Sequence, residues 1–146
     1  LANYRTSVPP HAHEAAKIVG VMVEGCGPCV QLCVDMARRA GMPDEQVEAV
    51  LVGELSGMDS NTSLAYRFAV ALCAGTLETG QLREEVLSTW GNAGVIELTL
   101  ACQISRIYPM IKTGLGFAGS CARIAIGERH ITVDQSVPIA RKTGAK

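Results

Sequence analysis

Three things are scarce in this sequence: aromatic side chains, an excess of charge of either sign, and long apolar runs. Thirteen Lys and Arg residues against fourteen Asp and Glu residues leave a formal net charge of −1. This balance excludes the basic excess that non-specific nucleic-acid binding requires. No apolar run approaches the roughly 20 residues that span a bilayer, so we expect no membrane partner. No charged segment followed by an apolar one opens the chain, which favours a cytoplasmic location.

Apolar residues, in contrast, are abundant. They make up 48% of the 146 residues, which is too much for a disordered chain, and the length suits one globular domain. We find no internal repeat and no linker, so we expect a single domain over 1–146, with its core at about 10–118 and a less regular C-terminal tail. Aromatic residues account for only 4%, and faces of small Ala, Val and Leu side chains suit closely packed helices and a subunit interface.

Helical signals recur along the chain. Pro10 can stand in the first turn of a helix, and Gly41 followed by Pro43 is typical of a helix end. The apolar run 18–23 fits a buried strand as well as a helix, and Pro109 is expected to kink or end the last helix. The sequence therefore predicts an all-α fold of about six helices. They span 10–23, 26–41, 44–55, 61–74 (capped by Asn61 or Ser63), 81–90 and 93–111.

The cysteines are the feature that needs an explanation. There are six: Cys26, Cys29, Cys33, Cys73, Cys102 and Cys121. The first three lie within eight residues, and the last three lie in apolar surroundings where they are most simply part of the core. A secreted disulfide framework would spread its cysteines through loops, so the pattern favours a reducing compartment.

The segment Cys26-Gly27-Pro28-Cys29 places a Cys-x-x-Cys pair at the start of a predicted helix. Unpaired N–H groups and the positive end of the helix dipole stabilise a thiolate there, so we expect a reversible disulfide and one thiol with a lowered pKa. Two alternatives are a pair of inert buried thiols and half of a metal site. A zinc site needs a second pair of ligands, and His130 stands alone, so we expect neither metal nor cofactor.

Two further residues are candidates for the same site. Cys33 lies one helical turn beyond Cys29 on the same face, where it is either a third active thiol or a small core residue. Glu14 precedes Cys26 by twelve residues. If the first two helices pack antiparallel, Glu14 lies level with position 33, so a proton relay would run from Glu14 through position 33 to Cys29. The alternative is a solvent-facing Glu14.

Three other polar residues have simpler interpretations. Glu97 interrupts an apolar helix and is expected to pair with an arginine, either Arg67 or Arg106 of a neighbouring subunit. His11 and His13 stand beside the start of the first helix and are interpreted as surface residues. The basic residues of segment 141–146 are expected to form a solvated tail.

The sequence resembles the carboxymuconolactone decarboxylase family, in particular its alkyl hydroperoxidase D-like branch. The resemblance lies in Glu14, which is followed after eleven residues by the Cys26-x-x-Cys29 pair at the start of a helix. The helix after Cys29, its glycine stop and its acidic restart are also similar. The resemblance implies an all-α subunit in trimers or hexamers. It implies that Cys29 attacks a peroxide, that Cys26 resolves it as a disulfide, and that Glu14 belongs to a proton relay.

Two positions depart from the family pattern. Pro28 stands where the family often has histidine, and Cys33 replaces the relay histidine. Because a thiol is a poorer proton shuttle than imidazole at neutral pH, disulfide exchange is favoured over peroxide turnover. We therefore expect a thiol–disulfide oxidoreductase or peroxidase that acts on a peroxide or disulfide and is regenerated by a thiol reductant protein.

Three alternative functions remain open. Cys-Gly-Pro-Cys is also the active-site tetrapeptide of thioredoxins, which are α/β proteins, whereas the segments after Met42 have helical patterns. A lactone decarboxylase of the wider family acts without this dithiol. The third alternative is a non-enzymatic helical module that binds partners or oligomerises and whose cysteines are incidental.

Overall fold

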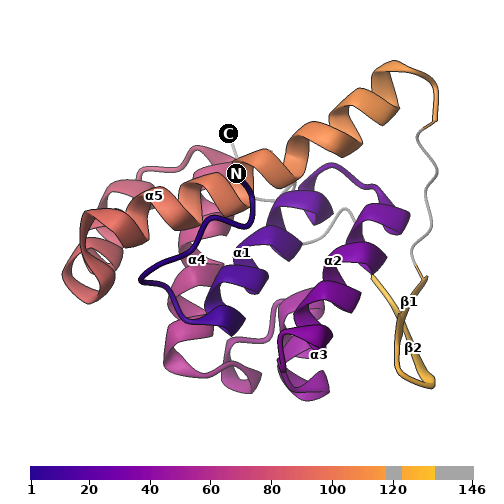
Figure 1. The fold of residues 1–146 in the computed structure, drawn as a ribbon, viewed down its shortest axis with the longest axis horizontal. Coiled ribbons are helices and arrows are strands. Elements are labelled where there is room, and N and C mark those ends of the chain that lie inside the picture. The colour runs from indigo at the N-terminus through magenta and orange to yellow at the C-terminus, as the bar shows by residue number, and fades with distance from the viewer. Residues whose placement is uncertain (118–122, 134–146) are drawn as a thin grey trace.

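The computed structural model describes residues 1–117 and 123–133, and it confirms the helical fold (Figure 1). The described part of the chain has five α-helices rather than about six. They are α1 (Pro10–Val23), α2 (Gly27–Arg39), α3 (Asp44–Val52), α4 (Ser60–Ala74) and α5 (Glu78–Gly114), with a short 3-10 turn at Leu55–Gly57. Cys121 and the basic segment 141–146 lie outside the described residues.

Helix α1 is the centre of the molecule. Every residue from 15 to 22 is buried, and the helix packs against α2, α3, α4 and α5 (Figure 1). The apolar run 18–23 is therefore a helix, and the strand alternative is wrong. Small side chains let the helices approach closely: a methyl group added at Gly20 would overlap the carbonyl oxygen of Cys102 on α5. This contact holds α1 and α5 at a separation that only glycine allows.

Helix α5 joins the two segments predicted as separate helices, and it does so across a break. Gly91 has φ 70° and ψ −171°, which is not helical, so the break lies between the predicted ends at 90 and 93. The expectation that Pro109 kinks or ends the helix is wrong about its end, because α5 continues to Gly114. The hydroxyl of Thr113 donates to the carbonyl oxygen of Pro109 one turn earlier (3.0 Å).

The predicted end of the third helix and the predicted start of the fourth need correction. The third helix ends at Val52 rather than at 55, because Gly53 takes the left-handed conformation (φ 76°) that closes a helix. The fourth begins at Ser60, and its cap is Asp59 rather than Asn61 or Ser63. The Asp59 carboxylate accepts a hydrogen bond from the backbone N–H of Thr62 (2.8 Å).

Residues 123–133 belong to the segment that was expected to be less regular, but they form a regular hairpin. Strands β1 (Arg123–Ile126) and β2 (Arg129–Thr132) form an antiparallel hairpin whose turn begins at Gly127. The amide of Gln31 on α2 bonds both the N–H and the carbonyl of Ala125, at 2.7 and 3.0 Å. The hairpin thus covers α2 with two buried isoleucines, Ile124 and Ile126. This hairpin is the only sheet in the described residues, unlike the α/β architecture of the thioredoxin alternative.

Glu97 anchors the N-terminal segment rather than pairing with an arginine. Its fully buried carboxylate accepts hydrogen bonds from the backbone N–H groups of Thr6, Ser7 and Val8 and from the Thr6 hydroxyl, at 2.6–3.1 Å. Burial raises the pKa of Glu97, but the bonds from Thr6, Val8 and Ser7 outweigh it and hold the pKa below its ordinary value. Backbone donors therefore replace the expected salt bridge.

No helix within residues 1–117 and 123–133 is long and apolar enough to cross a membrane.

Candidate functional site

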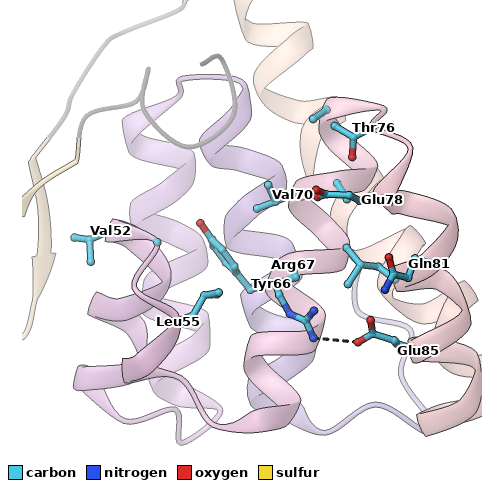
Figure 2. A pocket seen from close by; sticks show the side chains of 13 residues that line it. Val52, Leu55, Tyr66, Arg67, Val70, Thr76, Glu78, Gln81 and Glu85 are labelled. Carbon is cyan, nitrogen blue, oxygen red and sulfur yellow. Dashed lines mark hydrogen bonds and ion pairs between the residues drawn. The ribbon is translucent and has the colours of Figure 1, made fainter. Parts of the chain in front are cut away.

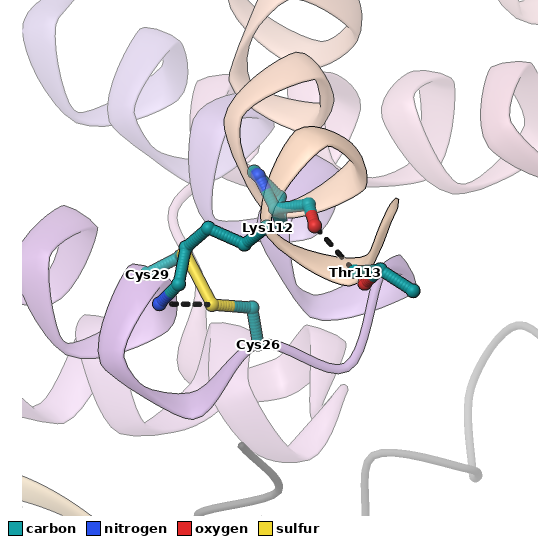
Figure 3. The surroundings of a disulfide bond; sticks show 5 residues. Cys26, Cys29, Lys112 and Thr113 are labelled. Carbon is teal, nitrogen blue, oxygen red and sulfur yellow. Dashed lines mark hydrogen bonds between the residues drawn. A yellow bond between two sulfur atoms is a disulfide. The ribbon is translucent and has the colours of Figure 1, made fainter. Parts of the chain in front are cut away.

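Cys26 and Cys29 are joined by a disulfide at the start of α2, as the sequence predicted for a Cys-x-x-Cys pair (Figure 3). Cys26 caps the helix with an extended backbone, and Cys29 lies in its first turn, so their Cα atoms are 5.3 Å apart. Pro28 suits this turn because it has no N–H to leave unpaired. Both cysteines are buried, with 5% and 6% of their surface exposed.

Lys112 is the residue of this site that sequence reasoning missed. It comes from the last turn of α5, and its ammonium group lies 3.7 Å from the sulfur of Cys26 (Figure 3). A cation at this distance favours the thiolate form of a reduced cysteine. No motif connects two positions 86 residues apart, and only the packing of α5 beside the α1–α2 turn brings them together.

Replacing Lys112 with methionine is expected to lower the reactivity of the Cys26 thiol. Loss of a cation this close removes a group that favours the thiolate, so alkylation at neutral pH should slow about tenfold. The measurement is the pH profile of iodoacetamide alkylation in a Cys29→Ser background, which leaves Cys26 unable to form this disulfide. Lys112→Arg is the control and should retain the profile. If Lys112→Met leaves the midpoint of the profile where it was, the role assigned to the ammonium group is wrong.

Cys33 is a free, buried thiol one turn beyond Cys29. Burial raises its pKa to about 11; the charge of Lys17 lowers it and that of Glu14 raises it. Charged groups on α1 therefore act on this thiol from the neighbouring helix. With that pKa, Cys33 stays protonated at neutral pH.

Glu14 is not the solvent-facing residue of the alternative interpretation. Its side chain is only 12% exposed, and its carboxylate pairs with the ammonium of Lys17 at 3.0 Å. Burial raises the pKa of Glu14, but contact with His13 and the charge of Lys17 outweigh it, so the net pKa is lowered. Lys17 is itself buried and donates to Asn3 Oδ1 at 2.8 Å. Glu14 is therefore an ionised carboxylate held in an ion pair.

The interpretation of His13 as a surface residue is wrong. Only 2% of its surface is exposed, because the first turn of α1 faces the core. His11 is half-buried. Nδ1 of His13 lies 3.7 Å from Glu14 Oε1. His13 therefore lies beside the carboxylate of Glu14, the residue to which the family resemblance gives a role in a proton relay, and helps to lower its pKa.

A separate cavity of about 600 Å³ lies between α4 and the first part of α5 (Figure 2). Tyr66 and Val70 line it from α4, and Gln81 lines it from α5. The Arg67–Glu85 ion pair (3.1 Å) closes one side, as Figure 2 shows. None of the lining residues belongs to the cysteine site. A non-enzymatic binding module would use this cavity, which is largely apolar in its lining.

Comparison of the chain with protein-family models, with curated proteins and with solved structures found no match. Among the described residues, no three His, Cys, Asp or Glu side chains are grouped so that they could hold a metal ion.

Proposed function

We propose that this protein is a thiol–disulfide oxidoreductase of the alkyl hydroperoxidase D-like type, in which Cys26 and Cys29 cycle between dithiol and disulfide. The observation that carries the proposal is the Cys26–Cys29 disulfide at the start of α2, with the Lys112 ammonium 3.7 Å from one sulfur. Helix terminus and ammonium both favour a thiolate, which is the reactive form in disulfide exchange.

The cycle assigns a role to each group. When Cys29 attacks a substrate disulfide, it forms a mixed disulfide and releases one substrate thiol. Cys26 then attacks Cys29, so the second substrate thiol leaves and the Cys26–Cys29 disulfide forms. A thiol reductant reverses these steps by attacking Cys29, which expels Cys26 as a thiolate beside Lys112. Lys112 thus stabilises Cys26 both as the attacking and as the leaving thiolate.

The state of Cys33 favours disulfide exchange over peroxide reduction. A relay residue must give and accept a proton near neutral pH, and a thiol with a pKa of about 11 does so poorly. Glu14, paired with Lys17, is ionised and would need a proton from elsewhere to pass one on. Disulfide exchange between thiolates makes less demand on such a relay. Peroxide reduction is thus the slower reaction in this proposal.

Restoring a histidine tests both parts of the proposal. With dithiothreitol as reductant, the wild-type protein should reduce bis(2-hydroxyethyl) disulfide above the rate of a Cys26→Ser, Cys29→Ser blank. Cys33→His should raise peroxide consumption about tenfold, because imidazole is a competent relay at neutral pH, and should leave disulfide reduction unchanged. If wild type and blank reduce the disulfide equally, the oxidoreductase proposal is wrong. If Cys33→His does not raise peroxide consumption, the relay hypothesis is wrong.

We also propose that the chain acts in the cytoplasm and forms a homo-oligomer, a trimer or hexamer as the family resemblance implies. The second half of α5 supports the assembly, because it exposes large apolar side chains. Ile107, Tyr108, Met110 and Ile111 are 47–64% exposed. Apolar side chains gathered on one helix commonly mark an interface. Sedimentation analysis of the purified chain measures the assembly directly.

A further inference from the structure

Two cysteines outside the Cys-x-x-Cys site face each other from different helices. The sulfur of Cys73 on α4 lies 3.2 Å from that of Cys102 on α5. Sequence reasoning assigned both to the core, but only Cys102 is fully buried, and Cys73 is partly exposed. Two sulfurs at this separation need to approach by little more than 1 Å to reach the length of a disulfide bond, about 2.05 Å.

The charges around the pair distinguish its two members. The hydrogen bond with Cys102 lowers the pKa of Cys73; burial opposes this, and the guanidinium of Arg106 lowers it further. The same bond, together with burial, raises the pKa of Cys102 far above its ordinary range. Arg106 is held in place by Glu24 at 2.6 Å. The accessible thiol is therefore the one that becomes a thiolate, and the buried thiol remains protonated beside it.

We propose that Cys73 and Cys102 form a second redox site, which a small peroxide converts into a disulfide between α4 and α5. The Cys73 thiolate attacks one oxygen of hydrogen peroxide. The O–O bond breaks, hydroxide leaves and takes up a proton to become water, and Cys73 becomes a sulfenic acid. The Cys102 thiol then attacks the Cys73 sulfur, which forms the S–S bond and releases a second water. The two thiols lose two electrons in total, and the peroxide gains them.

This second site is separate from the first. The charge of Arg106 lowers the pKa of Cys73, whereas the ammonium group that lies beside Cys26 belongs to Lys112, six positions later on α5. The reaction needs neither Cys26 nor Cys29. A small peroxide reaches a partly exposed thiol more easily than a protein substrate does, so the oxidant of this site is hydrogen peroxide. Its outcome is independent of the disulfide exchange proposed above.

Peptide mapping of the wild-type chain tests the proposal. The reduced protein is treated with hydrogen peroxide in excess of the two molecules per chain that two disulfides consume, alkylated under denaturing conditions and digested with trypsin. Cleavage after the neighbouring Lys and Arg residues places Cys73 in peptide 68–83 and Cys102 in peptide 84–106, while Cys26, Cys29 and Cys33 share peptide 18–38. The expected result is one species that links 68–83 to 84–106, two hydrogens lighter than the sum of the peptides and separated by reductant. The same species should form in the Cys26→Ser, Cys29→Ser variant.

Single substitutions assign the two roles. Cys102→Ser should leave a sulfenic acid on Cys73 that dimedone traps, and Cys73→Ser should leave Cys102 unreactive to peroxide and dimedone. Recovery of both cysteines as alkylated thiols, after the peroxide has oxidised Cys26 and Cys29, would overturn the proposal. So would a linkage of either peptide to 18–38, or to peptide 113–123 that contains Cys121.

Discussion

Replacing Cys29 with serine is expected to reduce disulfide turnover by more than about a hundredfold, to the rate of the uncatalysed reaction. Serine preserves the size of the side chain in the first turn of α2, but its hydroxyl neither ionises at neutral pH nor forms a mixed disulfide. Cys26→Ser should also lower turnover, because Cys29 then lacks the intramolecular thiol that resolves its mixed disulfide and only the slower attack of dithiothreitol on that disulfide remains. The measurement is reduction of bis(2-hydroxyethyl) disulfide with dithiothreitol.

Cys33→Ser is the matched control for this experiment. It removes a neighbouring thiol of the same helix face and similar burial, at 7% exposure against 6% for Cys29. Since Cys33 stays protonated, disulfide turnover should stay close to that of the wild type. Equal losses from Cys29→Ser and Cys33→Ser would mean that the effect arises from damage to α2 and not from the loss of the reactive sulfur.

Glu97→Gln is expected to lower the free energy of unfolding by about 3 kcal/mol. The carboxylate accepts from every donor that faces it, including the backbone N–H groups of Ser7 and Val8. A glutamine has only one accepting oxygen, so its NH₂ group would meet an N–H donor inside the protein. The measurement is urea unfolding at neutral pH. Glu85→Gln is the control: it breaks an exposed pair with Arg67 and should cost less than about 1 kcal/mol.

The effect of Glu97 should also depend on pH with a defined sign. Its pKa is lowered in the folded protein, so its stabilisation is fully present above the unfolded value of about 4.3 and is lost as the pH falls through the folded value. The difference in the free energy of unfolding between the wild type and Glu97→Gln should therefore become smaller as the pH falls below about 4. A difference that stays constant from neutral pH down to about pH 3 would show that the charge of Glu97 is not what holds the N-terminal segment.

The helices that sequence reasoning located correctly are those with local signals. Pro10 begins α1, Cys26 caps α2, and the break at Gly91 falls between two predicted helices. The predicted helix boundaries were wrong where another residue nearby ended or capped the helix. Gly53 ended α3 early, and Asp59 capped α4 ahead of the residues chosen from the sequence. The hairpin was missed because its short strands carry no clear alternation, and its only local signal is a two-residue turn that begins with Gly127.

The candidate site was predictable only as far as it is local. The Cys26–Cys29 pair and the relation of Cys29 to Cys33 follow from spacing along one helix. Lys112 and the Cys73–Cys102 contact depend on how helices distant in sequence pack, which no periodicity reports. The partners of Glu97 could not be predicted for the same reason. A buried carboxylate needs hydrogen-bond donors, but here they are backbone N–H groups of the N-terminal segment, whose sequence has no periodicity.

The interruption of α5 at Gly91 divides it into two lengths that need not move together. Helices open cooperatively along a continuous hydrogen-bond ladder, and a non-helical residue interrupts that ladder. The first length carries Gln81 and Glu85 of the cavity, and the second carries Cys102 and Lys112. A molecule that enters the cavity would therefore slow amide exchange in the first length, while the length that carries Cys102 and Lys112 keeps its own exchange rate.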